Sequence, residues 1–464
     1  MPGLPAPISL NSIMHISIIM NIQFKDRKGE LEELGEVLKS GKFELFIIYG
    51  RRRIGKTELI LNATKNKKRV YCLATGENNL ERFYRVCANF DPGAASLKKN
   101  WEVLFGFLKD RADAIIIDEF QNMIQEDKNI LNIFQSITDT ILKNSKTKLF
   151  LLGSSVSIIT SKLLSYKSPL YGRRTGSFNL GPISFFDLKE FFPNASPEQL
   201  TEIYGFADGT PFYLVKIDKE FWRWLKEELK RKRSFLRDEV DFLMRYEFDD
   251  PGTYKLILEA IANGKTKLGE IKDFIKVKRT DITPYLKNLG EINFIKRTVP
   301  VTENTKSRKG RYYLKDNFLK FWFNYIYPNQ SAIEEGIFEP SIIKKDYSAY
   351  LGFVFEDISK QYLIKTRQFK FTKIGKWWHK DKEIDIVALN EKNKEILFCE
   401  CEWKRGVNAE KVLAELKEKS QHVQWHNEKR KEHYAVFAKS FSKKVKEENV
   451  HCFDLKDLEK AFKK

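Results

Sequence analysis

The chain has 464 residues, 42% hydrophobic and 31% charged, so it is too long for one core and too apolar for a disordered protein. Its 82 basic and 63 acidic side chains give a net charge of +19, which favours nucleic acid or another polyanion as a partner, or else a lysine-rich solvated surface. Five scattered cysteines exclude a disulfide framework and fit reduced thiols in a cytoplasmic protein.

The first 21 residues are expected to form a loose leader, and translation begins at either Met1 or Met20. No basic region precedes the apolar run of this segment, and that run is too short to span a bilayer. We therefore expect no membrane association.

Residues 22–190 alternate helix-like and strand-like runs, which predicts a parallel α/β sheet. A helix is expected at residues 26–41, with Asp26 as its N-cap. The continuous apolar runs that follow are typical of strands buried on both faces. These strands are expected at residues 43–49, 69–74, 112–118 and 148–155.

The segment GRRRIGKT follows the first strand and has the full G-x-x-x-x-G-K-[ST] pattern of a phosphate-binding loop. Its glycines let backbone N–H groups close around phosphate oxygens, and the helix that begins there adds its positive dipole end. Lys56 is expected to bridge the β- and γ-phosphates of ATP, and Thr57 to offer its hydroxyl to Mg²⁺. The expected nucleotide-binding residues of this segment are Gly50, Arg51, Arg52, Arg53, Ile54, Gly55, Lys56, Thr57 and Glu58.

An adjacent Asp-Glu pair ends the third strand, in the segment IIIDEF. Asp118 can hold Mg²⁺ at the carboxyl end of a buried strand, and Glu119 can orient or deprotonate the attacking water. The pair predicts ATP hydrolysis rather than ATP binding alone, with Glu119 and Lys56 as catalytic residues.

Two later features offer polar groups to the same site. Ser154 and Ser155 end the fourth strand, where a hydroxyl either senses the γ-phosphate or simply makes a turn. Arg173 and Arg174 lie on a glycine-flanked loop. An arginine there either reaches the γ-phosphate, in its own chain or from a neighbouring subunit, or belongs to a basic surface or a DNA contact.

Beyond these residues the strand pattern fades. Residues 191–245 are mostly helical and are expected to form a lid. Residues 246–330 contain three short helices and then two strands around a basic turn, which is the pattern of a winged helix-turn-helix. Residues 331–464 contain a helix and a pair of strands around a charged turn, as expected of another α/β domain.

The winged-helix segment is either a DNA-binding module or a protein-docking or lid module. If it binds DNA, basic side chains on its recognition helix and wing would contact phosphates. The expected contacts are Arg279, Thr280, Lys287, Lys306, Arg308, Lys309 and Arg311.

Six segments resemble, in order and spacing, the archaeal ATPase family of AAA+/STAND-type P-loop ATPases. They are FKDRKGELEEL, GRRRIGKTEL, IIIDEFQN, LLGSSVSII, SPLYGRRTGSFNLGPIS and GTPFYL. The resemblance implies a P-loop NTPase sheet over about residues 22–215, with Phe24 and Arg27 near the adenine and Pro211 in a nucleotide-facing lid. It also implies that Arg173 or Arg174 is catalytic.

The same resemblance implies a winged helix and then a C-terminal α/β domain similar to restriction-endonuclease-like PD-(D/E)xK nucleases. On this basis Asp385 on the first strand and Glu400, Glu402 and Lys404 on one face of the second are candidate site residues, with Glu356 as an extra acid.

This C-terminal motif departs from its relatives, which usually read E-[VC]-K-W. Alignment on Trp403 puts Glu402 where the lysine is expected. Either Lys404 substitutes for that lysine, or the nuclease-like site is weakened or inactive.

The leading hypothesis is a Mg²⁺-dependent ATPase that couples its nucleotide state to a DNA-binding winged helix and a nuclease-like domain. The alternatives are a slow ATP-dependent regulatory switch with an inactive nuclease-like domain, and a chaperone-like ATPase. A homo-oligomer or a protein partner is compatible with each.

Overall fold

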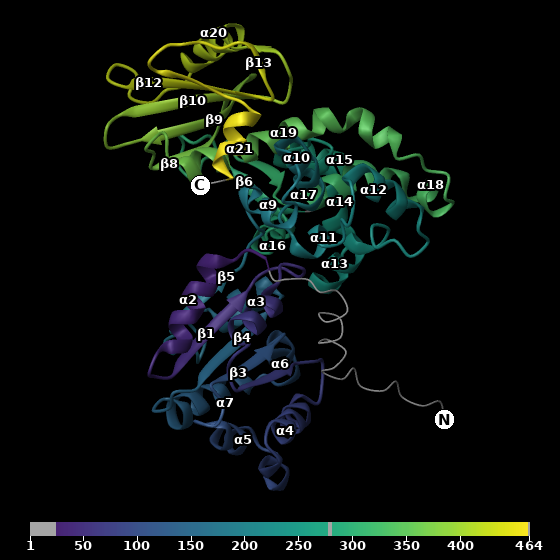
Figure 1. Ribbon diagram of the computed structural model, residues 1–464, viewed down its shortest axis with the longest axis vertical. Coiled ribbons are helices and arrows are strands. Elements are labelled where there is room, and N and C mark those ends of the chain that lie inside the picture. The colour runs from purple at the N-terminus through teal and green to yellow at the C-terminus, as the bar shows by residue number, and fades with distance from the viewer. Residues whose placement is uncertain (1–24, 277–280, 463–464) are drawn as a thin grey trace. The chain divides into compact units, whose positions relative to one another are not determined.

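The computed structural model describes residues 25–276 and 281–462 (Figure 1). Phe24, Arg279, Thr280 and the two candidate start positions, Met1 and Met20, lie outside these residues. The described residues form two compact units. The first comprises residues 25–48, 55–152 and 173–177, and the second comprises residues 49–54, 153–172 and 178–462, less the gap at 277–280.

The sheet of the first unit has the order β2-β3-β4-β1-β5, and β2, β3 and β4 run parallel. Its strands are β1 Glu44–Tyr49, β2 Arg69–Leu73, β3 Ala114–Asp118, β4 Lys148–Gly153 and β5 Gly176–Asn179. The helices of this part are α2 Lys28–Lys39, α3 Lys56–Ala63, α4 Asn79–Phe90, α5 Trp101–Leu108, α6 Gln121–Glu126 and α7 Ile130–Ser136. The predicted parallel α/β sheet and its four strands are confirmed.

The expected N-cap of the first helix is wrong. Helix α2 is capped by Arg27, not Asp26, and Arg27 makes no side-chain cap hydrogen bond. Both residues have left-handed backbone, with φ of 68° at Asp26 and 66° at Arg27. Two successive left-handed residues redirect the chain just before the helix, so the Asp26 carboxylate is not at the capping position.

The second unit contains a helical region followed by a hairpin. Its helices are α8 Val156–Ile158, α9 Leu188–Phe191, α10 Pro197–Ala207, α11 Pro211–Leu214, α12 Phe221–Lys230, α13 Glu239–Glu247, α14 Gly252–Ala262, α15 Leu268–Phe274, α16 Thr283–Glu291, α17 Asn317–Phe321 and α18 Gln330–Glu334. Strands β6 Ile295–Thr298 and β7 Arg311–Leu314 pair antiparallel directly after α16. Three short helices and a hairpin therefore occur in the predicted order.

A mixed sheet of order β14-β12-β10-β9-β8 ends the second unit. Strands β8, β9 and β10 are antiparallel neighbours, whereas β10, β12 and β14 run parallel. The elements are α19 Ser341–Thr366, β8 Lys373–His379, β9 Lys382–Asn390, β10 Glu395–Glu402, β11 Val407–Asn408, α20 Ala409–Ser420, β12 Lys431–Ala438, β13 Phe441–Lys443, β14 Val450–Phe453 and α21 Leu455–Ala461.

Side chains alternate between the two faces of this sheet, as the pleat requires. Ile396 and Phe398 pack in one core with Leu413 of α20, whereas Leu397 and Cys399 belong to the core that includes α19. Figure 1 shows α20 on one face and α19 with α21 on the other.

Helix α19 joins the helical region to the mixed sheet. The hydroxyl of Tyr350 donates to the backbone oxygen of Gly205 in α10 at 2.6 Å, and the ring of Phe355 packs on Trp403 beside β10. None of the helices in the described part of the chain combines the length and hydrophobicity that crossing a bilayer requires.

Candidate nucleotide site and carboxylate cluster

The two glycines of the phosphate loop meet different backbone requirements. A Cβ on Gly50 would lie 2.3 Å from the backbone oxygen of Leu180, and Gly50 has a φ of 153°. Gly55 has a φ of 90° and is the N-cap of α3, whose first residue is Lys56. Only glycine meets both requirements at low energy, so the loop follows the path that the sequence pattern predicts.

Asp118 lies at the carboxyl end of β3 and is 2% exposed. Its carboxylate accepts hydrogen bonds from Thr57 Oγ1 at 2.6 Å and from the Tyr71 hydroxyl at 2.9 Å. Burial raises the pKa of Asp118, although both hydrogen bonds oppose that rise. The Thr57 hydroxyl and the Asp118 carboxylate are adjacent hard oxygen donors, which suits Mg²⁺.

Glu119 is held next to this carboxylate in a left-handed backbone conformation, with a φ of 56°. Its N–H donates to Asp118 Oδ1 at 2.9 Å, and its side chain accepts from the amide of Gln121. A glutamate with positive φ is uncommon and marks a position that the surroundings enforce. Gln121 and Tyr71 were missed from the sequence, although a tyrosine inside a buried apolar strand is a weak sign of a polar partner.

The loop arginine Arg51 is paired within the second unit. Its Nη2 atom lies 2.5 Å from Asp316 Oδ2, and the two side chains are 8% and 3% exposed. Asp316 also caps helix α17 by accepting from the Leu319 N–H at 2.7 Å. One carboxylate therefore serves both the phosphate loop and the start of a helix.

The other two loop arginines contact α13 and its neighbours. Arg53 donates to both oxygens of Glu239, at 3.1 and 3.2 Å, and its guanidinium lies 3.8 Å from the centre of the Phe212 ring. Arg52 lies 3.4 Å from the centre of the Tyr246 ring. Each arginine that fills a variable position of the motif thus has a specific partner.

Ser154 and Ser155 differ in their surroundings. The Ser154 hydroxyl is 2.8 Å from the Tyr246 hydroxyl, and the Ser155 hydroxyl is 3.3 Å from that of Ser157. Both serines are buried at the end of β4.

The remaining predicted residues of this site are spread over several elements. Arg173 makes a bidentate pair with Asp139, at 2.7 to 2.9 Å, and Arg174 is half-buried. Arg27 is buried and bonded to Glu30. The other two predicted residues, Glu58 and Pro211, lie in the first turns of two helices. Glu58 lies in the first turn of α3, where burial raises its pKa, and Pro211 is the first residue of α11.

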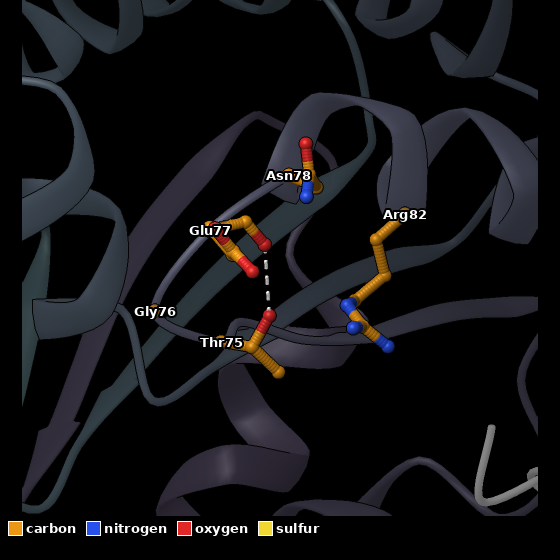
Figure 2. Close-up of a pocket in the computed structure, with 5 residues that line it drawn as sticks. All are labelled: Thr75, Gly76, Glu77, Asn78 and Arg82. Carbon is orange, nitrogen blue, oxygen red and sulfur yellow. Dashed lines mark hydrogen bonds between the residues drawn. The ribbon is translucent and has the colours of Figure 1, made fainter. Parts of the chain in front are cut away.

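A shallow pocket lies at the carboxyl end of β2, in the loop that leads to α4 (Figure 2). The Thr75 hydroxyl donates to the Glu77 backbone oxygen at 3.0 Å, and the fully buried Asn79 braces the loop through Thr75. Because Leu73 pairs with Asp118 across β2 and β3, this loop leaves the sheet at the same edge as the acidic pair. The pocket is lined by Thr75, Gly76, Glu77, Asn78 and Arg82.

The predicted basic contacts of the hairpin are not equally available. Lys306 and Arg308 are exposed, and Lys309 is paired with Glu303 at 2.6 Å. Arg311 instead pairs with Glu383 of β9 at 2.9 Å and lies 4.7 Å from the centre of the Trp378 ring.

Two other contacts involve strand β8 and helix α16. The backbone N–H of Val301 donates to the oxygen of Lys376 in β8. Lys287 of α16 is exposed and 3.8 Å from Glu291.

Three acidic side chains of the C-terminal domain lie together, and we name Glu356, Asp385 and Glu400 the carboxylate cluster. Asp385 accepts from the backbone N–H of Cys401 at 2.9 Å and hydrogen bonds with Glu400. Burial, reinforced by the Asp385 charge, raises the pKa of Glu356 to about 7 and that of Glu400 to about 8. Burial also raises the pKa of Asp385.

Two lysines that the sequence did not point to reach this cluster. Lys376 of β8 pairs with Glu356, and Lys419 of α20 pairs with Glu400 at 2.8 Å. Lys376 lies on the strand just before the predicted strand pair and Lys419 on the helix after it, so neither falls within the E-x-K spacing.

Lys404 and Glu402 lie apart from the cluster. The Lys404 side chain is 75% exposed and pairs with Glu402 at 2.8 Å. In the described part of the chain, no three His, Cys, Asp or Glu side chains are arranged to hold a metal ion. Two of the three carboxylates of the cluster, those of Glu356 and Glu400, are instead paired with lysines.

Two family models match this chain, one over the candidate nucleotide site and one over part of the C-terminal region. Residues 24–217 match a family described as "ATPase domain predominantly from Archaea", and residues 322–422 match DUF234, described as "Archaea bacterial proteins of unknown function". The uncharacterized protein MJECL04 of Methanocaldococcus jannaschii is 52% identical over 444 residues, which are 94% of this chain and 100% of that protein.

Two more distant proteins are similar over the ATPase part and beyond. The uncharacterized ATP-binding protein MJ1659 of the same organism is 25% identical over 369 residues, which are 70% of this chain and 95% of that protein. The Walker-type ATPase PABY2304 of Pyrococcus abyssi, a solved structure, is 21% identical. It aligns with a TM-score of 0.50 over 65% of this chain and 96% of its own, which supports the shared fold.

Proposed function

Since the chain belongs to the archaeal ATPase family, with a DUF234 domain after the ATPase domain, we propose that it hydrolyses ATP with Mg²⁺. We further propose that its nucleotide state controls a DNA-binding winged helix and the C-terminal domain. The observation that carries this proposal is the pairing of loop residues Arg51 and Arg53 with Asp316 and Glu239.

The proposed chemistry uses groups of the first unit. Lys56 binds the β- and γ-phosphates, and Thr57 with Asp118 holds Mg²⁺, which would neutralise charge on the phosphates. Glu119 takes a proton from the attacking water, and Gln121 keeps its carboxylate in place. Arg173 or Arg174 stabilises charge on the γ-phosphate, and Arg173 can do so only after leaving Asp139.

The proposed coupling runs through the loop arginines. Phosphate binding draws the backbone of residues 50–54 around the ligand, and Arg51 and Arg53 cannot follow it without straining their ion pairs with Asp316 and Glu239. Asp316 begins α17, directly after the β6–β7 hairpin, and Glu239 begins α13. A change in the loop would therefore reach both the lid helices and the proposed winged helix.

The experiment that tests this function is steady-state ATP hydrolysis by the full chain, with and without duplex DNA. Lys56→Ala serves as the blank. Stimulation by DNA that disappears in Lys56→Ala supports the proposal. Absence of ATP turnover would contradict the catalytic role proposed for Glu119. An equal rate of ATP turnover with and without DNA would contradict the proposed coupling.

A second candidate function for the C-terminal domain is DNA cleavage. The carboxylate cluster supports it, but the pairing of Glu356 and Glu400 with lysines favours the version in which this domain binds without cutting. The two versions separate in a plasmid-nicking assay with Mg²⁺ or Mn²⁺, in which wild type is compared with Asp385→Ala. Cleavage lost in Asp385→Ala would establish the nuclease.

A further inference from the structure

Helix α19 is buried along one side and exposed along the other. Its buried side packs in the core of the second unit, where the hydroxyl of Tyr347 donates to the backbone oxygen of Glu202 in α10 at 2.7 Å. Its exposed side carries three large apolar residues, since Ile342 is 55% exposed, Phe353 68% and Ile364 47%. Figure 1 shows this long helix in green at the border of the helical region.

The three exposed residues lie on one line along the helix, and we name Ile342, Phe353 and Ile364 the apolar stripe. Phe353 is eleven residues after Ile342 and eleven residues before Ile364. Eleven residues make about three turns of an α-helix, so the three side chains project in almost the same direction. Single exposed apolar residues are normal on a protein surface, whereas an aligned set along most of a helix marks an interaction surface.

Two opposite charges lie on the same line, between the apolar residues. Asp346 is seven residues before Phe353, and Lys360 is seven residues after it. Seven residues make about two helical turns, so both side chains project with the stripe. Asp346 is exposed and Lys360 is half-buried. The line is therefore symmetric about Phe353 in its apolar residues and opposite in the signs of its charges.

Neither charge is neutralised by an ion pair of its own chain. Within residues 25–276 and 281–462, no oppositely charged side chain lies within ion-pair distance of Asp346 or Lys360. Burial and the charge of Lys296 lower the pKa of Lys360, and Asp357 on the same helix opposes that shift. A carboxylate supplied from outside would therefore stabilise the Lys360 ammonium group.

We propose that the apolar stripe binds the same stripe of a second copy of this chain, with the two α19 helices antiparallel and a two-fold axis at Phe353. The two Phe353 rings then meet on the axis. Ile342 lies opposite Ile364 of the partner subunit, and Asp346 lies opposite Lys360 of the partner subunit. This inference goes beyond the proposed ATPase function and does not rest on it.

The spacing of the stripe favours this occupant over others. A two-fold interface requires that if residue i contacts residue j, then j also contacts i, and the equal spacings on the two sides of Phe353 meet that requirement. A parallel pair would instead place Asp346 against Asp346 of the partner subunit, which like charges disfavour. A membrane surface or an unrelated protein would require no such symmetry.

The apolar and charged residues would contribute differently to this dimer. Burial of large apolar side chains is the main source of affinity, at about 25 cal/mol for each Å² removed from water. Exposed ion pairs contribute at most about 1 kcal/mol each, but a like-charge contact is unfavourable. The stripe would therefore supply the affinity, and Asp346 and Lys360 would fix the antiparallel orientation.

The first test measures the mass of the full chain by sedimentation velocity over a range of concentrations, without nucleotide. We expect wild type to dimerise and Phe353→Glu to weaken the dimer at least about tenfold, because two carboxylates would then meet on the axis. The matched control is Leu256→Glu. Leu256 of α14 is 43% exposed and lies outside the stripe, so this variant should dimerise within about twofold of wild type.

The second test reverses one charge at a time. Asp346→Lys alone places lysine against lysine twice in each dimer, and Lys360→Glu alone places acid against acid twice, so each variant should dimerise at least about fivefold more weakly than wild type. An equimolar mixture of the two variants restores both opposite-charge contacts in a heterodimer. We therefore expect the mixture to dimerise although neither variant does so well alone.

Several results would overturn the inference. These are a wild type that stays monomeric at about 100 µM, an equal loss in Phe353→Glu and Leu256→Glu, or a mixture of charge variants that dimerises no better than either alone. A monomeric wild type that binds phospholipid vesicles would assign the stripe to a membrane surface instead. Circular dichroism checks the fold of each variant. Phe353 and Asp346 are exposed, so Phe353→Glu and Asp346→Lys decide the question even if Lys360→Glu does not fold.

Discussion

The guanidinium of Arg51 and the carboxylate of Asp316 form a buried ion pair at 2.5 Å that links the phosphate loop to helix α17. Burial lowers the pKa of Arg51, but Asp316 and other neighbouring groups hold it above its ordinary value. When one partner of a buried pair is removed, the other charge is left without compensation, which costs more than the intact pair contributes. Loop geometry and helix packing are therefore energetically connected.

Asp316→Asn should destabilise the second unit by about 3 kcal/mol, because Arg51 then keeps a buried charge without its partner. Asparagine and aspartate are about equally good N-cap residues, so the start of α17 is preserved. The measurement is urea unfolding of the full chain followed by tryptophan fluorescence, with weaker ATP binding as a second readout.

The matched control is Asp281→Asn. Asp281 accepts a hydrogen bond from the Thr283 N–H near the start of α16 but lies on the surface. Its substitution should change the unfolding free energy by less than about 0.5 kcal/mol. Equal midpoints for the two variants would contradict the importance of the Arg51–Asp316 pair.

Glu119→Gln should leave ATP binding intact and lower ATP turnover at least about 100-fold, because the amide cannot accept the proton of the attacking water. The check is single-turnover hydrolysis together with equilibrium binding of ATP. Lys56→Ala, by contrast, should lose both. Turnover within twofold of wild type in Glu119→Gln would eliminate it as the base.

Gln121→Ala tests a positioning residue. Because the Gln121 amide donates to the Glu119 carboxylate, its loss should leave that carboxylate less well placed to take a proton from the attacking water. We expect kcat to fall about tenfold with little change in KM, and Gln121→Glu to fall as well because it cannot donate the same hydrogen bond when ionised. An equal change in kcat and KM would contradict a positioning role for Gln121.

The first sheet could be predicted because each strand is a local run of apolar residues that ends in a motif, as at Asp118. Side chains that reach the site from distant segments of the chain could not be predicted. Glu239 and Asp316 meet the loop arginines across more than 180 residues, and neither lies in a recognisable pattern. Tyr71 was missed because a tyrosine inside an apolar strand is only a weak sign of a hydrogen bond to the next strand.

The C-terminal domain was predictable in part, because some of its strands are also local runs with a clear pattern. Strands β9 and β10 were expected from their alternating runs, whereas β8 carries several polar residues and was not identified. Lys376 lies on β8, so its pairing with Glu356 was also missed. The expected substitute, Lys404, lies beyond the end of β10 and points to solvent, since leaving the strand ended the alternation on which that expectation rested.

Gly50→Ala should abolish ATP binding, because the added Cβ would lie 2.3 Å from the Leu180 backbone oxygen, and backbone cannot yield as a flexible side chain does. The readout is binding of a fluorescent ATP analogue, with circular dichroism to follow overall folding. Gly106→Ala is the matched control. Gly106 lies within α5, and a Cβ added there would meet open space, so this change should be neutral or stabilise by up to about 1 kcal/mol. Unchanged analogue binding by Gly50→Ala would contradict the loop geometry.

Glu400→Gln should make the chain more stable at pH 8 than wild type, with little difference at pH 5. Because burial raises the pKa of Glu400 to about 8, the folded protein keeps a proton that the unfolded chain releases near its ordinary value. Wild-type stability contributed by this group is therefore complete below about pH 4 and is lost as the pH rises toward 8. Glutamine keeps a neutral side chain at every pH and removes that slope, and each pH unit corresponds to at most about 1.4 kcal/mol.

The measurement is the difference in unfolding midpoint between Glu400→Gln and wild type at intervals from pH 5 to 8.5, and this difference should grow with pH. Lys404→Met is the control, because Lys404 is exposed and pairs with Glu402, and its profile should follow wild type. Lys419→Met should extend the loss of stability to higher pH, since Lys419 is the cation that stabilises ionised Glu400. A difference between Glu400→Gln and wild type that does not change with pH would contradict the carboxylate cluster described above. A larger effect of Lys404→Met than of Lys419→Met would indicate that Lys404, and not Lys419, acts on Glu400.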